Sequence, residues 1–118
     1  MREPTKEEDR IIRFLISNSC AEHALDVRFG PYMVQEMQDG GMGSLYIIPK
    51  AIATKTKRET GPMVAEIHAK DIDNIELVIS LFLDTDLTPF ELDIWKVDFT
   101  PLRSLSQVIK DIEPVSKK

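Results

Sequence analysis

The sequence contains little of what the commonest disulfide, metal and cofactor sites are made of. Its 118 residues include one cysteine, Cys20, and two histidines, His23 and His68. A single cysteine cannot form an internal disulfide, which fits the reducing cytoplasm, and three such residues are too few for a typical structural zinc site. We therefore expect a cytoplasmic protein with no metal and no cofactor.

Long apolar runs are missing as well. No uninterrupted run exceeds a few residues, whereas a membrane-spanning helix needs about 20. The N-terminus begins Met1-Arg2-Glu3-Pro4 and stays charged, so it lacks the apolar region of a secretory signal. We expect no contact with a membrane. We also expect a single domain over residues 1–118 with a disordered tail at 113–118, because this length can bury a core.

Positive charge is scarce in the second half of the chain. Residues 1–60 carry nine basic and nine acidic side chains, while residues 61–118 carry six and eleven, which accounts for the whole net charge of −5. Between residues 61 and 99, Lys70 and Lys96 oppose nine acids, so the net charge there is 2 − 9 = −7. Such a field repels the phosphates of nucleic acids and attracts basic partners, although an acidic sheet surface is more often only a solvated one.

Two helices are predicted, one near each end of the chain. Thr5 and Glu8 have the spacing of a capping box, and apolar residues at helical spacing follow, so the first helix should run from about Lys6 to Ser17 or Asn18. A last short helix is predicted after Ser104, with Pro114 ending it.

Between the helices, period-two alternation and turn residues predict strands. The segments 32–38 and 44–48 flank Asp39-Gly40-Gly41-Met42-Gly43, which is a hairpin signal. A strand from Met63 and a long strand over 75–84 flank a turn at 71–74, and a turn at 84–89 leads into a strand that begins at Phe90.

Two segments are harder to place. Leu25, Val27 and Phe29 alternate, but Gly30-Pro31 interrupts them, so a strand there would be short or at an edge. The basic segment 50–62 has weak periodicity and reads as an exposed loop or a frayed helical turn. The fold class that follows is α+β, with the N-terminal helix packed on an antiparallel sheet of about five strands.

The alternation slips near Trp95. Phe90, Leu92 and Ile94 share one parity, whereas Val97 and Phe99 have the other. A β-bulge near residues 94–96 would return the last two to the core and leave Lys96 on the solvent side. The alternative is a sheet covered on both faces, with Trp95 beneath a second layer. The residues expected to be buried are Ile12, Leu15, Ile16, Leu45, Ile47, Ile67, Leu77, Ile79, Leu81, Leu92, Ile94 and Phe99.

No motif for catalysis stands out. Asp71/Asp73 and Asp84/Asp86 are the nearest approach to cation sites, but both pairs fall at turns, where aspartate is favoured for its own backbone bonds. The glycines at 40–43 lie between strands and lack the lysine of a phosphate loop, so we interpret them as a turn. Cys20 and His23 are three residues apart without a local nucleophile signature, and His68 is expected to point to solvent.

The best candidate for a recognition surface lies in the last predicted strand. A tryptophan is more often buried in a core, but tryptophan is also enriched at binding hot spots, and nearby acids would select a cationic partner. We therefore expect a non-enzymatic binding or regulatory protein that contacts a basic protein and no nucleic acid. The alternative is a small enzyme, or an enzyme subunit, with a carboxylate site at Glu91, Asp93 and Asp98. The candidate partner-binding residues are Glu91, Asp93, Trp95, Lys96 and Asp98.

The chain resembles a family of small, uncharacterised bacterial proteins that share a domain of unknown function. The resemblance is carried by Arg2-Glu3-Pro4-Thr5-Lys6-Glu7-Glu8, by Asp39-Gly40-Gly41-Met42-Gly43-Ser44-Leu45, and by the segment ELDIWKVDFTPL at 91–102. It covers nearly the whole chain, and the chain departs from the family pattern in the basic segment 50–62 and in its extended C-terminus. The resemblance implies no catalytic residues. By analogy alone, small acidic proteins of this type are sometimes partners of toxins or effectors.

Overall fold

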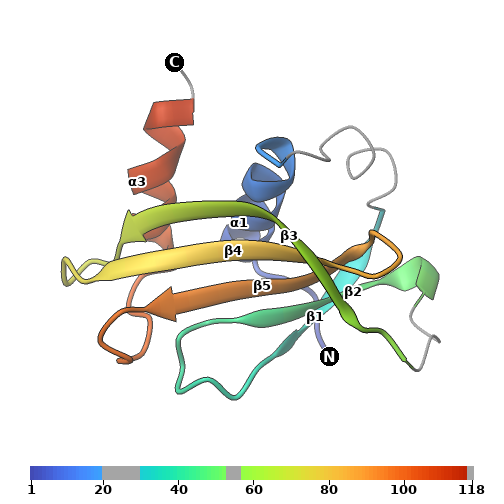
Figure 1. Cartoon of the computed structure of the whole chain (residues 1–118). Coiled ribbons are helices and arrows are strands. Elements are labelled where there is room, and N and C mark those ends of the chain that lie inside the picture. The colour runs from blue at the N-terminus through green and yellow to red at the C-terminus, as the bar shows by residue number, and fades with distance from the viewer. Residues whose placement is uncertain (20–29, 53–56, 117–118) are drawn as a thin grey trace.

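A five-stranded antiparallel sheet with two helices packed on one of its faces makes up the structure (Figure 1). The computed structural model describes residues 1–19, 30–52 and 57–116, with side chains as far as Ile112. The predicted α+β class, the N-terminal helix and the short C-terminal helix are confirmed.

The strands follow the order β1-β2-β5-β4-β3, and every neighbouring pair is antiparallel. The last strand in sequence, β5, therefore lies in the middle of the sheet, between two hairpins. Its position explains why acidic residues of the second half of the chain reach the centre of the sheet surface. The strands are β1 (Tyr32–Glu36), β2 (Leu45–Pro49), β3 (Thr60–Lys70), β4 (Glu76–Asp84) and β5 (Pro89–Lys96).

The helix α1 (Lys6–Ser17) begins at the predicted capping box. The Thr5 hydroxyl accepts a bond from the Glu8 backbone N–H at 3.1 Å, and the Glu8 carboxylate accepts one from the Thr5 N–H at 2.8 Å. These bonds satisfy donors that a helix start would otherwise leave unpaired. The face that packs on the sheet consists of Ile11, Ile12, Leu15 and Ile16.

The helix α3 (Leu105–Ser116) begins after Ser104, whose hydroxyl accepts a bond from the Gln107 N–H at 3.2 Å. Val108, Ile109 and Ile112 are buried, as the helical spacing predicts. The prediction that the helix ends at Pro114 is wrong, because it continues to Ser116. A proline so near the end of a helix removes only one backbone bond, and that loss does not stop the last turn.

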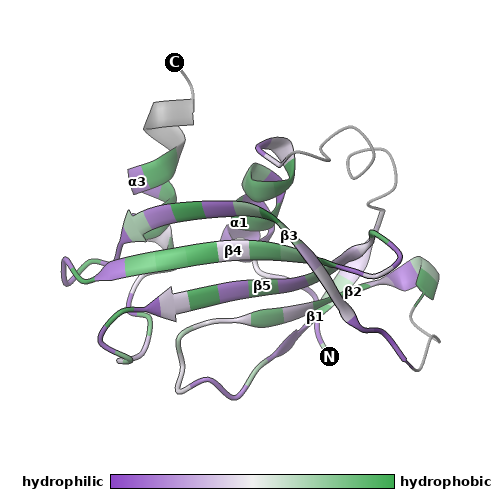
Figure 2. Cartoon of the chain, viewed as in Figure 1, coloured by the Kyte–Doolittle hydropathy of each residue, from purple (hydrophilic) through white to green (hydrophobic). Residues whose placement is uncertain are grey.

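The core lies between the helices and the sheet, and the strand alternation that produces it is visible in Figure 2. All the residues expected to be buried are buried except two: Ile67 is partly buried against the core, and Phe99 is exposed. Among the described residues, no helix or strand covers the sheet face that points away from the helices.

The segment 50–62, predicted to be an exposed loop or a frayed helical turn, begins with a helical turn and ends in a strand. A short 3-10 helix, η1 (Lys50–Ile52), follows β2, and residues 53–56 lie outside the described part of the chain. The strand β3 already begins at Thr60 rather than at Met63, so the predicted boundary is wrong by three residues. Register shifts between Thr60 and Ala65 let the strand pass Gly61-Pro62, which alternation alone did not reveal.

The predicted bulge near residues 94–96 is wrong. The ladder between β4 and β5 runs regularly to its end, where Lys96 lies opposite Leu77 and Trp95 opposite Val78. The strand then stops, so Val97 and Phe99 leave the sheet and are exposed. The two-layer alternative is also wrong, because Trp95 is 42% exposed.

An irregularity does occur in this hairpin, but at the other end of β5. Pro89 lies opposite Leu83 and Glu91 opposite Phe82, which leaves Phe90 as the extra residue. Phe90 therefore does not share a face with Leu92 and Ile94 as predicted, and its ring lies 6.0 Å from that of Tyr46.

Candidate functional site

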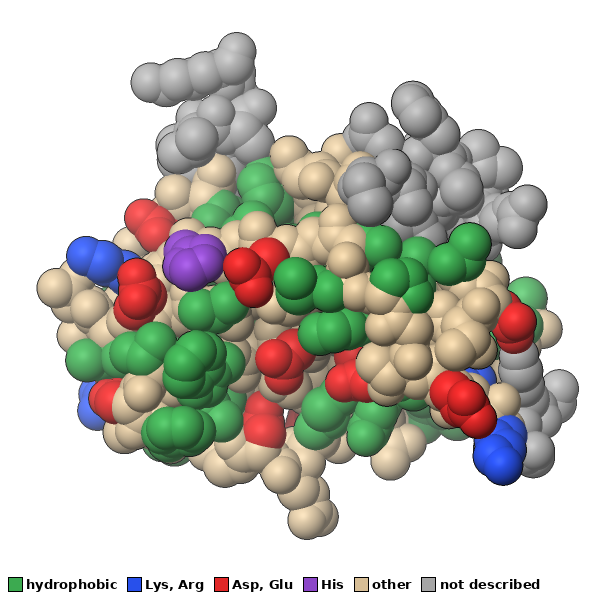
Figure 3. Space-filling view, in the orientation of Figure 1, with side chains coloured by type: hydrophobic (Ala, Val, Ile, Leu, Met, Phe, Trp, Pro, Cys, Tyr) green, Lys and Arg blue, Asp and Glu red, His purple; other side chains and the backbone are tan. Residues whose placement is uncertain are grey.

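The sheet surface that faces away from the helices is the candidate site, and we call it the open face. Figure 3 shows acidic side chains lying among apolar ones on this surface. Because side chains alternate along a strand, the open face receives every second residue of each strand. It consists of Met33 and Gln35 from β1, Tyr46 and Ile48 from β2, Met63, Glu66, His68 and Lys70 from β3, Glu76, Val78, Ser80 and Phe82 from β4, and Glu91, Asp93 and Trp95 from β5.

Cross-strand pairing arranges the open face in rows. In the middle row, Ser80 lies between Glu66 and Asp93, so a small side chain separates two carboxylates. Neighbouring strands are about 4.8 Å apart, which places these two acids roughly 10 Å from one another across the sheet. The flanking rows are mostly apolar: His68, Val78 and Trp95 on one side, and Met63, Phe82, Glu91 and Tyr46 on the other.

Asp93 is the acid of the open face with the clearest perturbation. Partial burial raises its pKa, a hydrogen bond with the Ser44 hydroxyl at 3.4 Å opposes that change, and the nearby charge of Asp39 adds to it. The ionised form of Asp93 is therefore less well solvated than that of a surface carboxylate. A cation placed beside it would stabilise this ionised form.

His68 points to solvent, as predicted, and its Nε2 lies 3.6 Å from a carboxylate oxygen of Glu66. The two side chains are half-exposed, so this contact is a surface feature.

Lys96, one of the five predicted partner-binding residues, does not belong to the open face. Its side chain points to the opposite side of the sheet and is 0% exposed. The ammonium group donates to Asp71 at 2.9 Å, to Asp73 at 2.6 Å and to the carbonyl of Pro101 at 3.1 Å. The expectation of a solvent-facing Lys96 is therefore wrong, because these acceptors satisfy all three donors of a buried ammonium.

Asp71 organises the loops around this lysine. Its carboxylate also accepts bonds from the backbone N–H groups of Ile72, Arg103 and Ser104, at 2.7, 2.7 and 2.9 Å. Burial acts to raise the pKa of Asp71, but Lys96 and these donors outweigh it, so the pKa lies below the usual value. The cluster ties the 71–74 turn to the start of α3 and is structural in kind.

Asp98 lies in the loop after β5, where its carboxylate accepts bonds from the backbone N–H and the hydroxyl of Thr100, at 3.1 and 2.6 Å. Of the five predicted residues, the structure brings Glu91, Asp93 and Trp95 together on the open face. It places Lys96 in the core and Asp98 in an exposed turn.

A second buried ion pair was not anticipated from the sequence. Arg58 donates to Asp84 at 2.9 Å and to the carbonyls of Ile47 and Pro89 at 2.7 and 2.6 Å, and its guanidinium lies 4.8 Å from the centre of the Phe90 ring. The pKa of Asp84 is lowered: burial opposes this, and the Thr88 N–H and Arg58 outweigh it. In the sequence, Arg58 stood out only as one of the basic residues of the segment 50–62, and nothing there indicated that it is buried.

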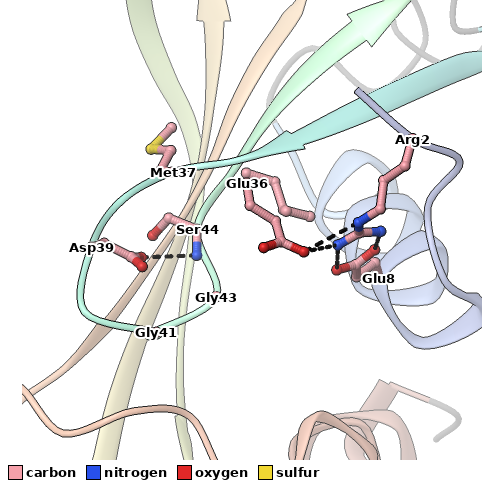
Figure 4. A pocket seen from close by; sticks show the side chains of 9 residues that line it. Arg2, Glu8, Glu36, Met37, Asp39, Gly41, Gly43 and Ser44 are labelled. Atoms are coloured by element: carbon pink, nitrogen blue, oxygen red, sulfur yellow. Dashed lines mark hydrogen bonds and ion pairs between the residues drawn. The ribbon is translucent and has the colours of Figure 1, made fainter.

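A pocket of about 220 Å³ lies at the glycine turn, beside the N-terminal segment (Figure 4). Arg2 donates two bonds of 2.8 Å to Glu8 and two, of 3.0 and 3.2 Å, to Glu36. Asp39 accepts bonds from the N–H groups of Met42 and Ser44. Each charged group that lines the pocket is thus engaged within the protein. A second pocket, of about 340 Å³, is lined by Lys70, Asp71, Ile72, Asn74, Gln107 and Asp111.

The aspartate pairs at the turns are engaged by the protein's own groups. Asp71 and Asp73 hold Lys96, while Asp84 holds Arg58 and accepts bonds from the N–H groups of Asp86 and Thr88. Within residues 1–19, 30–52 and 57–116 there is no group of three potential metal ligands and no helix long and apolar enough to cross a membrane. Cys20 and His23 lie outside the described residues.

Comparison with protein families gives a match over most of the chain. A family model described as "Domain of unknown function (DUF6984)" matches residues 1–106, which include the whole sheet and α1. The matched part ends at the start of α3. No curated protein and no solved structure matches the chain.

Proposed function

We propose that this chain, which belongs to the DUF6984 family of domains of unknown function, is a binding protein whose open face contacts a basic segment of a partner protein. The observation that supports this is the alternation of apolar and acidic rows on an uncovered sheet face. Trp95 and Tyr46 are about two-fifths exposed, and Glu66 and Asp93 lie in the row between them.

The charge of the open face selects the class of partner. Its acids are Glu66, Glu76, Glu91 and Asp93, and its one defining cation is Lys70, opposite Glu76 in the end row, so its net charge is 1 − 4 = −3. Apolar rows favour contact with apolar side chains, while the carboxylates favour lysine or arginine. A partner segment that alternates basic and apolar side chains would match both. Nucleic acid would bring phosphates against carboxylates, which is unfavourable.

The alternative is a small enzyme with a carboxylate site, and the raised pKa of Asp93 is the observation that favours it. That site would need Glu91, Asp93 and Asp98 to converge in a cleft. Asp98 instead bonds to Thr100 in a turn, and both pockets described above are lined by other residues. We therefore favour binding. The proposal includes a cytoplasmic location, which rests on the single cysteine.

The test is capture of a partner by the immobilised protein from a lysate of the native cell, followed by binding measurements with the purified partner. The informative variant carries Glu66→Lys and Asp93→Lys. We expect a protein rich in lysine or arginine, with an affinity that falls about tenfold or more in the double variant and weakens as salt rises.

The control is Glu3→Lys, which reverses an exposed charge that pairs with Lys50 at the N-terminal segment. It should leave the affinity unchanged. The proposal would be overturned by a captured partner whose affinity changes neither with salt nor with Glu66→Lys and Asp93→Lys. Preferential capture of nucleic acid would also overturn it.

A further inference from the structure

Two exposed aromatic rings meet at one end of the open face, and we call them the aromatic corner. Trp95 is 42% exposed and Phe99 69% exposed, with ring centres 6.2 Å apart and planes tilted by 56°. Tryptophan is enriched at binding hot spots, and aromatic side chains in general are enriched in protein interfaces.

The backbone at Phe99 is held in an unusual conformation. Its φ of +63° lies in the left-handed region, which bulky side chains rarely adopt. Leu87, at the tip of the β4–β5 hairpin, is the only other apolar residue with a positive φ among those described, also +63°, and it is 61% exposed. Phe99 differs from Leu87 in that its ring contacts a second aromatic ring on the open face.

The buried lysine explains how Phe99 is kept in this position. The Phe99 N–H donates to the Lys96 carbonyl at 2.8 Å, and the Lys96 ammonium holds the carbonyl of Pro101 at 3.1 Å. The loop that carries Phe99 is therefore fixed at both ends to a residue that is itself locked by two aspartates. Strained, exposed positions that the surrounding structure holds in place are characteristic of functional sites.

We propose that the aromatic corner is the anchor of the binding face and seats an arginine side chain of the basic partner, stacked on Trp95 and Phe99. This inference rests on the proposed function. Cations bind favourably over aromatic faces, tryptophan most of all, and guanidinium groups stack well on them. A contact of this kind occurs within the described residues, between Arg58 and Phe90. Asp93, next to Trp95 on the same face, supplies the negative charge.

The test uses the fluorescence of Trp95, the only tryptophan in the chain, so the signal comes from the corner itself. The probe is a synthetic peptide of alternating arginine and leucine, and its control replaces arginine by citrulline, which has a similar shape without the charge. We expect a saturable change with the arginine peptide and an affinity roughly threefold to thirtyfold lower with the citrulline peptide. Equal affinities would overturn the assignment of a cationic occupant.

Phe99→Gly tests the corner without threatening the fold, because glycine tolerates a positive φ and little burial is lost. We expect it to weaken binding of the arginine peptide several-fold, while Leu87→Gly, the matched control, leaves binding unchanged. If Phe99→Gly has no effect but Glu66→Lys with Asp93→Lys abolishes binding, the proposal that the open face binds the partner is retained. The proposal that the aromatic corner seats an arginine is then refuted. If none of these variants changes the affinity, the proposed function itself fails.

Discussion

Lys96 and Asp71 form an ion pair of 2.9 Å in which neither side chain is exposed to solvent. Asp71 is the first residue of the turn at 71–74, and Lys96 is the last residue of β5, so the pair joins this turn to the end of that strand. A buried charge is tolerated only when its donors and acceptors are paired, and here both partners are saturated by further bonds. This pair holds the loop of Phe99 and the start of α3 in place.

Lys96→Met should therefore destabilise the protein markedly, although methionine is apolar and similar in length. The substitution leaves the buried Asp71 without its cation, while Asp73 keeps an ion pair with the exposed Arg103 at 3.2 Å. Removing one partner of a buried pair costs far more than the pair itself contributes. The measurement is urea unfolding followed by circular dichroism. Lys70→Met, at an exposed position of β3, is the control and should change the midpoint little.

A second variant separates the charge from the packing. Lys96→Met combined with Asp71→Asn should recover part of the lost stability, because the buried carboxylate is then neutral. An additive loss in the double variant would show that the pair contributes through shape rather than charge.

Acid should unfold the protein through Asp71 and Asp84. The pKa of each carboxyl is lower in the native state than in the unfolded chain, so its stabilising effect is present above the unfolded value of about 3.9 and is lost as pH falls through the lower native value. Asp84→Asn should reduce stability near pH 7 and converge with the parent protein in acid. Parallel stability profiles from neutral to acid pH would contradict this.

Asp93 should behave in the opposite way. Its pKa is raised in the native state, so ionisation opposes folding at neutral pH, and stability gains as pH falls through the raised value. We expect Asp93→Asn to raise the unfolding midpoint at pH 7 and to weaken binding of the arginine peptide. Asp98→Asn should not be stabilised, because its amide oxygen accepts the two bonds from Thr100 without the charge that strengthens them. Gain of stability with unchanged binding would place Asp93 outside the contact.

Gly61 should resist substitution, because β3 passes very close to β4 at this point. A Cβ added to Gly61 would lie 2.6 Å from the carbonyl carbon of Asp84, which is backbone and cannot move aside cheaply. Gly61→Ala should cost about 1–3 kcal/mol in the free energy of unfolding. Gly30→Ala, where nothing lies within 4 Å of the added carbon, should cost within about 0.5 kcal/mol. Equal costs would refute the close approach.

Local patterns in the sequence determined most of the fold. The capping box at Thr5 and Glu8 placed the start of α1 correctly, and alternation in Leu77, Ile79 and Leu81 identified the inward side of β4. Asp39-Gly40-Gly41 marked the β1–β2 hairpin, and three glycines of this turn have positive φ. These signals are local because bonds between near neighbours or a two-residue period suffice to produce them.

Of the candidate site, the sequence identified Glu91, Asp93 and Trp95, since one strand places alternate residues on one face. It could not show that Glu66 and Ser80 lie beside them, because strand order and register depend on the whole sheet. It also overcounted the acidic surface, because Asp71 and Asp84 are buried against Lys96 and Arg58, and Asp73 pairs with Lys96 and with the exposed Arg103.

Lys96 shows the limit most clearly. From sequence, a lysine between Trp95 and Val97 belongs on the solvent side, and a bulge is required to keep the pattern regular. In the structure the strand needs no bulge, because carboxylates 23 and 25 residues away meet the ammonium inside the protein. The sequence by itself determined which segments are helices and strands. Only the tertiary structure decided which charges are buried, since a buried charge is stabilised by partners that the chain brings together on folding.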